Sequence, residues 1–141
     1  MIVITDSNIV FSALKTPNGV VAKILSEKSN IQFYAPSYLI DEVKKHSGTI
    51  SENKKEVLQR LKILLERIEI IDVDEIPKKK VLEAIEIVKD IGIDNAFFVA
   101  LYLFKKHKIW TSDKVLIKGL ESKGYKICIT TSELKTKLYK K

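Results

Sequence analysis

The 141-residue sequence contains few of the residues that cross-link a chain or interrupt its structure. Cys128 is the only cysteine, which excludes an internal disulfide and a cysteine-based zinc cluster. Five glycines and three prolines are too few for a long flexible linker. No apolar run approaches the ~20 residues that span a membrane, and no basic stretch precedes Asp6 as a secretion signal would require. We therefore expect one cytoplasmic domain over residues 1–141, with no membrane contact.

Arginine is also scarce, because 23 of the 25 basic residues are lysines. The net charge of +7 is concentrated at one end: residues 105–141 carry 11 lysines and three acids, whereas residues 1–104 are almost neutral. Such asymmetry favours a polyanionic partner, and nucleic acid is the usual one. A plain alternative stays open, since base-reading contacts favour arginine and lysine-rich compositions also occur in heat-adapted organisms.

Short β-branched runs alternate with amphipathic segments along the chain. The runs predict five strands, at residues 2–4, 31–35, 69–73, 109–111 and 126–129. The segments between them predict helices after Asp6, at 20–28, from 36 to Gly48, from Ser51 to 68, from Pro77 to Gly92, at 96–104, at 116–122 and from Ser132. Leu82 is expected to face inward, and the apolar run 96–104 is expected to lie against the sheet. This alternation predicts a three-layer α/β/α sandwich around a mainly parallel five-stranded sheet.

Four acidic residues stand at the ends of these predicted elements. Asp6 follows the first strand and Asp113 the fourth, so both should reach the same edge of the sheet, where sites form in such folds. Glu42 lies in a mostly apolar helix, and Asp94 just precedes the apolar run. An acid at an inward-facing position is costly unless it is paired or binds a metal. The alternative is that Glu42 faces solvent and Asp94 caps a helix.

If the four acids converge, their chemistry is that of a metal site. Carboxylates packed together raise one another's pKa, and a divalent cation relieves the repulsion. Ligands that are all oxygen select Mg²⁺ or Mn²⁺ over softer metals. Such a site can bind phosphate oxygens and lower the pKa of a bound water, which is the chemistry of phosphodiester hydrolysis. The basic final quarter would then hold the rest of a nucleic-acid backbone.

Four segments, taken in order, resemble the PIN-domain nucleases, a family that includes the VapC-type toxins of toxin–antitoxin pairs. Val3 to Leu14 resembles the opening motif, a hydrophobic run followed by Asp6, Ser7 and Asn8. The other segments are residues 35–43, where Glu42 takes the acidic position, residues 94–103, and residues 109–114, where Thr111 and Asp113 fall in the expected places. Each motif alone is weak, whereas the ordered set over residues 1–130 is fairly specific.

The resemblance implies a Mg²⁺- or Mn²⁺-dependent ribonuclease, with RNA as substrate and with an antitoxin protein and a second copy of the chain as partners. It assigns the metal site to Asp6, Glu42, an acid of the third motif and Asp113. It also implies that Asn8 orients Asp6, and that Thr111 and Ser112 hold the last acid's loop or a water. The third acidic position falls on Asn95, and Asp94 stands one residue earlier. Either Asp94 serves there, or Asn95 acts as a neutral ligand and the site loses a charge.

Two other classes of protein remain as alternatives. The first is a phosphotransfer domain, such as a haloacid dehalogenase-like phosphatase or a receiver domain. The former requires Asp-x-Asp after the first strand, where this chain has Asp6-Ser7-Asn8. The second is a catalytically weak or inactive PIN-like module that only binds RNA or a partner, which the asparagine at position 95 favours. Loss of activity on removing divalent metal would distinguish an enzyme from a binding module.

Overall fold

The computed structural model describes residues 1–139. Five strands form one sheet: β1 (Ile2–Thr5), β2 (Gln32–Pro36), β3 (Ile68–Ile71), β4 (Ile109–Trp110) and β5 (Cys128–Ile129). Their order is β3-β2-β1-β4-β5, and every pair is parallel. The predicted mainly parallel sheet is thus confirmed and is parallel throughout. β1 and β4 are buried along nearly their whole length, which explains their continuous apolar sequences.

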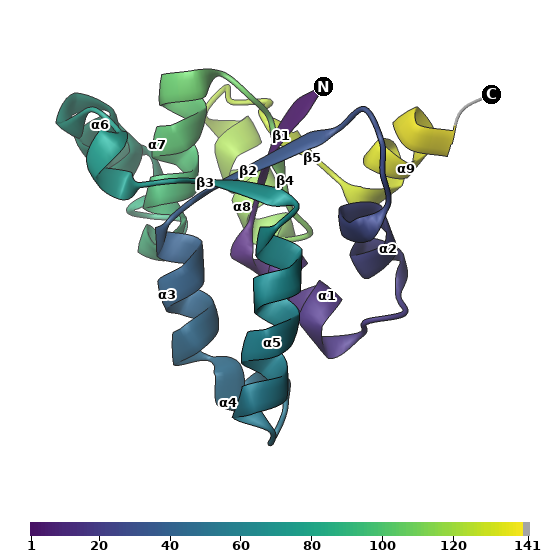
Figure 1. Ribbon diagram of the computed structural model, residues 1–141. Helices are drawn as coiled ribbons and strands as arrows, with labels where there is room; N and C mark the ends of the chain where they lie inside the picture. Colours follow the sequence, from purple (N-terminus) through teal and green to yellow (C-terminus); the bar gives the residue numbers. More distant parts are fainter. Residues whose placement is uncertain (140–141) are drawn as a thin grey trace.

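The helices cover both faces of this sheet (Figure 1). After β1 come α1 (Ser7–Lys15) and α2 (Val20–Ser26), and after β2 come α3 (Tyr38–Lys45), α4 (Ser47–Ile50) and α5 (Lys54–Leu65). Between β3 and β4 lie the 3₁₀ turn η1 (Val73–Glu75), α6 (Lys78–Val88), the 3₁₀ turn η2 (Ile93–Asn95) and α7 (Ala96–Lys105). The chain ends with α8 (Lys114–Ser122), β5 and α9 (Thr131–Tyr139). The expected three-layer sandwich is present.

The sheet reverses its winding direction at β1. From β1 the chain builds outward to β2 and β3, and then returns to place β4 on the other side of β1. Because parallel crossovers are right-handed, this reversal puts the helices of the two halves on opposite faces. The carboxyl ends of β1 and β4 border the resulting crevice, which is where ligands bind in open α/β sheets.

The apolar run predicted to lie against the sheet does so. α7 packs against β1, β2 and β4, and Phe98, Val99 and Leu101 are almost completely buried. A continuous apolar sequence is stable here because α6 and the sheet cover α7 from two sides. None of the helices formed by residues 1–139 is both long and apolar enough to cross a membrane.

Several predicted element ends were wrong, each for a local reason. Gly48 does not end a helix but lies inside the single turn α4. α5 begins at Lys54 rather than Ser51, because Asn53 caps it by accepting a hydrogen bond from the Glu56 amide at 3.2 Å. α6 ends at Val88, four residues before Gly92.

Leu82 was also predicted wrongly, since 57% of it is exposed. The side of α6 that packs inward carries Ala84, Ile87 and Val88. Leu82 therefore lies one position away from the row of residues that face inward on α6. The strand predicted at 69–73 starts one residue earlier and is shorter, and the last strand is reduced to Cys128–Ile129.

Candidate active site

Asp6 and Asp113 lie at the carboxyl ends of neighbouring strands, as the sequence predicts. Thr5 at the end of β1 is in register with Trp110 at the end of β4, and each acid follows within three residues. Asp6 is only 3% exposed. A carboxylate this deep in a protein is costly to ionise, so its surroundings decide what it can do.

Two hydrogen bonds hold the Asp6 carboxylate in place. The Asn8 amide donates to Oδ1 at 3.2 Å, and the Thr111 hydroxyl donates to Oδ2. Burial raises the pKa of Asp6 above its ordinary value despite these bonds, and the negative charge of Asp113 raises it further. The first bond agrees with the expectation for Asn8 in part. The contact is made by the backbone, and the Asn8 side chain is exposed.

Thr111 joins the two acids. Its buried hydroxyl donates to Asp6 and accepts a hydrogen bond from the Asp113 amide at 3.0 Å. Asp113 in turn caps α8, because its Oδ1 accepts from the amides of Val115 and Leu116 at 3.0 and 3.2 Å. The role predicted for Thr111, holding the loop of the last acid, therefore matches its contacts. Ser112 is exposed.

Glu42, in α3, is half-buried, and its side chain is hydrogen-bonded to a residue of α1. The Ser7 hydroxyl of α1 donates to Glu42 Oε1 at 2.5 Å. Burial raises the pKa of Glu42, and the charges of Asp94 and Asp6 add to that rise. The alternative in which Glu42 simply faces solvent does not hold. Sequence reasoning missed Ser7 as a site residue, although its place beside Asp6 was a usable signal.

Asp94, rather than Asn95, contacts the side chains around Glu42. Asp94 lies in η2 and accepts a hydrogen bond from the Tyr38 hydroxyl at 3.3 Å. Burial, with the charges of Glu42 and Asp94, raises the pKa of Tyr38 to about 12, so the phenol stays protonated and can donate. The Asn95 amide group donates to the Gly92 carbonyl at 3.2 Å and closes the turn. Tyr38 was not predicted as a site residue.

The chemistry of the four acidic side chains fits a hard divalent cation, but their spacing fits it less well. The four acids supply only oxygen, and none of them takes part in the ion pairs formed among residues 1–139. Their uncompensated charge favours a cation such as Mg²⁺ or Mn²⁺. However, across the described part of the chain no three His, Cys, Asp or Glu side chains are gathered closely enough to hold one ion. A bound cation would have to draw the acids closer together.

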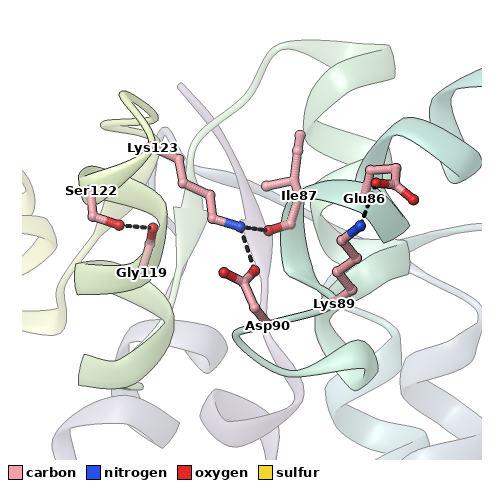
Figure 2. Close-up of polar contacts among 7 residues, drawn as sticks. All are labelled: Glu86, Ile87, Lys89, Asp90, Gly119, Ser122 and Lys123. Atoms are coloured by element: carbon pink, nitrogen blue, oxygen red, sulfur yellow. Dashed lines mark hydrogen bonds and ion pairs between the residues drawn. The ribbon is translucent and has the colours of Figure 1, made fainter.

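Polar contacts made by Lys123 join the segment before Asp94 to the helix after Asp113 (Figure 2). Lys123, just past α8, donates to the Ile87 carbonyl of α6 at 2.6 Å and pairs with Asp90. This contact lowers the pKa of Asp90. Beside it, Gly119 of α8 lies so close to Ile91 that a Cβ would come within 2.8 Å of its side chain.

The chain belongs to the PIN-domain family, because the model of that family matches residues 4–138. PIN domains are generally nucleases, which places the chain with hydrolases acting on nucleic acids. No curated protein sequence matches the chain. The fold is similar to that of a chain in the crystal structure of VapBC2 from Rickettsia felis bound to a DNA fragment from their promoter. That likeness has a TM-score of 0.69 and 18% identity, over 92% of this chain and 97% of the other.

Proposed function

We propose that the protein is a Mg²⁺- or Mn²⁺-dependent endoribonuclease that hydrolyses RNA in the cytoplasm. The observation that carries this proposal is the deeply buried Asp6, joined to Asp113 through the Thr111 hydroxyl at the crevice where the sheet reverses. A buried carboxylate with a raised pKa and no cationic partner is typical of a functional site rather than of a stabilising one.

Asp6, Glu42, Asp94 and Asp113 would hold the cation, with Asp6 and Asp113 from one side and Glu42 and Asp94 from the other. When bound, the cation supplies a water of lowered pKa and balances charge on the phosphate. The chain's own residues orient the ligands: Thr111 and the Asn8 amide hold Asp6, and Ser7 holds Glu42. The lysines after residue 104 would contact phosphates flanking the cleaved bond.

Cleavage of a mixed RNA pool tests this proposal. The purified chain is assayed with Mg²⁺, with Mn²⁺ and with EDTA, beside Asp6→Asn and a matched control, Asp72→Asn. Asp72 is an exposed aspartate that caps η1, outside the site. We expect cutting that requires metal, survives in the control and is lost in Asp6→Asn. Cutting that persists in EDTA or in Asp6→Asn would overturn the proposal.

A second function, binding without cleavage, is favoured by Asn95. A neutral residue occupies the position where the family resemblance implies an acid, and its amide group is already bonded to Gly92. In that case, RNA binding would persist in EDTA, would weaken steeply with salt, and would not lead to cutting with either metal. The cleavage assay, run beside a measurement of RNA binding in EDTA, separates the two functions.

We also propose that the chain pairs with an antitoxin protein and with a second copy of itself. The likeness in fold to a chain of the VapBC2 structure supports the first partner. Exposed apolar side chains on α5, with Ile63 64% exposed, support a protein contact of either kind. Light scattering gives the mass of the purified chain, and Ile63→Lys should return a dimer to the monomer mass if α5 forms the contact. A monomeric parent chain would contradict the dimer.

A further inference from the structure

Phe97 is an aromatic side chain at the edge of the acidic site whose position the core does not explain. It lies in the first turn of α7, three residues after Asp94, and is only half-buried. Within residues 1–139 it is neither in the hydrophobic core nor among the partly buried apolar side chains packed on it. Its neighbour Phe98, by contrast, is 1% exposed. An aromatic ring half in water beside a polar site offers a face on which a flat ligand can stack.

The Phe97 ring connects the acids to a cavity. On one side it stacks on Tyr38, with ring centroids 5.2 Å apart and planes tilted by 47°. The Tyr38 hydroxyl in turn donates to Asp94, so Tyr38 lies between Phe97 and the acidic residues. On the other side Phe97 lines a cavity of about 400 Å³ formed by η1 and the start of α6. That volume is in the range of small-ligand sites, roughly 300–1,000 Å³.

The polar groups of the cavity indicate what it would hold. Its lining includes two acidic residues, Asp74 and Glu75, one basic residue, Lys78, and the apolar residues Pro77 and Val81. Two acids against one base repel a phosphate. They favour a planar, partly apolar group with N–H donors at its edge, and the exocyclic amino groups of adenine, cytosine and guanine are such donors. Uracil has none.

We propose that this cavity is a nucleobase site, in which one unpaired base beside the cleaved phosphate stacks on Phe97 and donates from its amino group to Asp74 or Glu75. The proposal deepens the nuclease function and rests on it for the place of the base along the strand. Stacking on an aromatic ring holds unpaired bases because every base has a flat face. The carboxylates add a preference for amino-bearing bases over uracil.

The proposed base site is held in place by the same segments that hold the acidic residues. The Ser37 amide donates to the Ile71 carbonyl at 2.8 Å, and the Ser37 hydroxyl accepts from the Val73 amide at 3.0 Å. These bonds tie η1 to the residue before Tyr38. A base in the cavity would thus be held at a set distance from Glu42 and Asp94, which would determine which bond of the strand reaches the acids.

Fluorescence of a short single-stranded RNA containing one 2-aminopurine tests the proposal, because stacking quenches that base. Binding is measured in Ca²⁺, and cleavage separately in Mg²⁺ and Mn²⁺. The variants are Phe97→Leu, which removes the ring, and Phe97→Trp, which restores one. Phe104→Leu is the matched control, since Phe104 is another half-buried phenylalanine of α7 but is packed on the core.

We expect Phe97→Leu to abolish the quenching and to raise Kd roughly tenfold to a hundredfold. Phe97→Trp and Phe104→Leu should bind like the parent chain. Asp74→Asn combined with Glu75→Gln should reduce the preference for oligo(A) over oligo(U). Equal Kd and equal quenching in Phe97→Leu and the parent chain would overturn the base site.

The two proposals fail in distinguishable ways. Metal-dependent cutting with Kd and quenching unchanged in Phe97→Leu keeps the nuclease and removes the base site. Quenching lost in Phe97→Leu, in a chain that cuts with neither metal, keeps the base site and removes the nuclease. A parent chain that does not bind the oligonucleotide removes the base site whatever the cleavage assay shows.

Discussion

The Thr111 hydroxyl donates to the buried carboxylate of Asp6, 105 positions away in the chain. The same oxygen accepts from the Asp113 amide, so one side chain sets the positions of two acids at once. Thr111 is itself completely buried. Its replacement by a residue without a hydroxyl leaves the buried Asp6 carboxylate with the Asn8 amide as its remaining hydrogen-bond donor from the site described above.

Thr111→Val should destabilise the fold by about 1–3 kcal/mol, because the Asp6 carboxylate loses a buried donor while the shape of the side chain is kept. RNA cleavage should fall at least tenfold as Asp6 and Asp113 lose their link. Urea unfolding measures the first effect and the RNA assay the second. Thr111→Ser keeps the hydroxyl and serves as the control. A valine variant as stable and active as the serine variant would contradict the role given to this bond.

For Thr5→Val, the same substitution at an equally buried position, we expect the opposite effect on stability. Thr5 is 0% exposed, and its hydroxyl has no hydrogen-bond partner among residues 1–139. An unsatisfied buried hydroxyl costs free energy, so replacing it with a methyl group should leave the free energy of unfolding unchanged or raise it by about 1 kcal/mol. Both variants replace threonine with valine at a buried position. Comparing their unfolding in urea therefore isolates the contribution of the hydrogen bond to stability. A loss of more than about 1 kcal/mol in Thr5→Val would show an unrecognised partner.

Asp6→Asn should raise the melting temperature at pH 7 in EDTA, although it removes activity. Because burial raises the pKa of Asp6, the folded state binds this proton more tightly than the unfolded state does. The contribution of Asp6 to stability is therefore present at low pH and is lost as the pH rises from its ordinary value of 3.8 through the raised value. Asparagine carries no charge and avoids that loss.

Thermal unfolding from pH 4 to pH 8 checks this prediction. The advantage of Asp6→Asn should amount to about 3 °C for each kcal/mol, and it should shrink as the pH falls and the wild-type carboxyl takes up its proton. Mg²⁺ or Mn²⁺ should raise the melting temperature of the parent chain and not that of the variant. A variant that melts below the parent chain at pH 7 in EDTA would mean that the hydrogen bonds to Asp6 outweigh its burial.

Gly119→Ala should destabilise the fold by about 1 kcal/mol although alanine favours helices. The added Cβ would lie 2.8 Å from the Ile91 side chain, and overpacking typically costs about 1–3 kcal/mol, against a helix gain of about 0.5–1 kcal/mol. Gly48→Ala in α4 is the matched control, because the nearest atom to the added Cβ is Cε of Lys54 at 3.9 Å, and it should be neutral or stabilising. Adding Ile91→Ala to Gly119→Ala should reduce the clash, and an additive loss would contradict it.

The arrangement of the candidate site was predicted only in part, and the reasons are physical. The place of Asp6 and Asp113 at one edge of the sheet was predicted correctly, because each follows a short apolar strand and the carboxyl ends of parallel strands meet at one edge. Ser7 and Tyr38 were missed because their partners, Glu42 and Asp94, are 35 and 56 positions away. For Ser7 its place beside Asp6 was a usable signal, whereas no local pattern indicated the contact of Tyr38. Nor did the sequence indicate that the Asn8 contact with Asp6 comes from the backbone.

The alternation of strands and helices, the parallel sheet and the acids at its carboxyl edge could be predicted from the sequence, because they follow from periodicity and chain order. Helix ends depended on capping bonds, so Asn53 rather than Ser51 starts α5. The inward face of α6 depended on its packing, so Leu82 is exposed. The contact of Asp94, rather than Asn95, with Tyr38 and the position of Phe97 beside a cavity could not be predicted. Those facts depend on how η1, η2 and α3 pack together, and that packing is formed by contacts between distant parts of the chain.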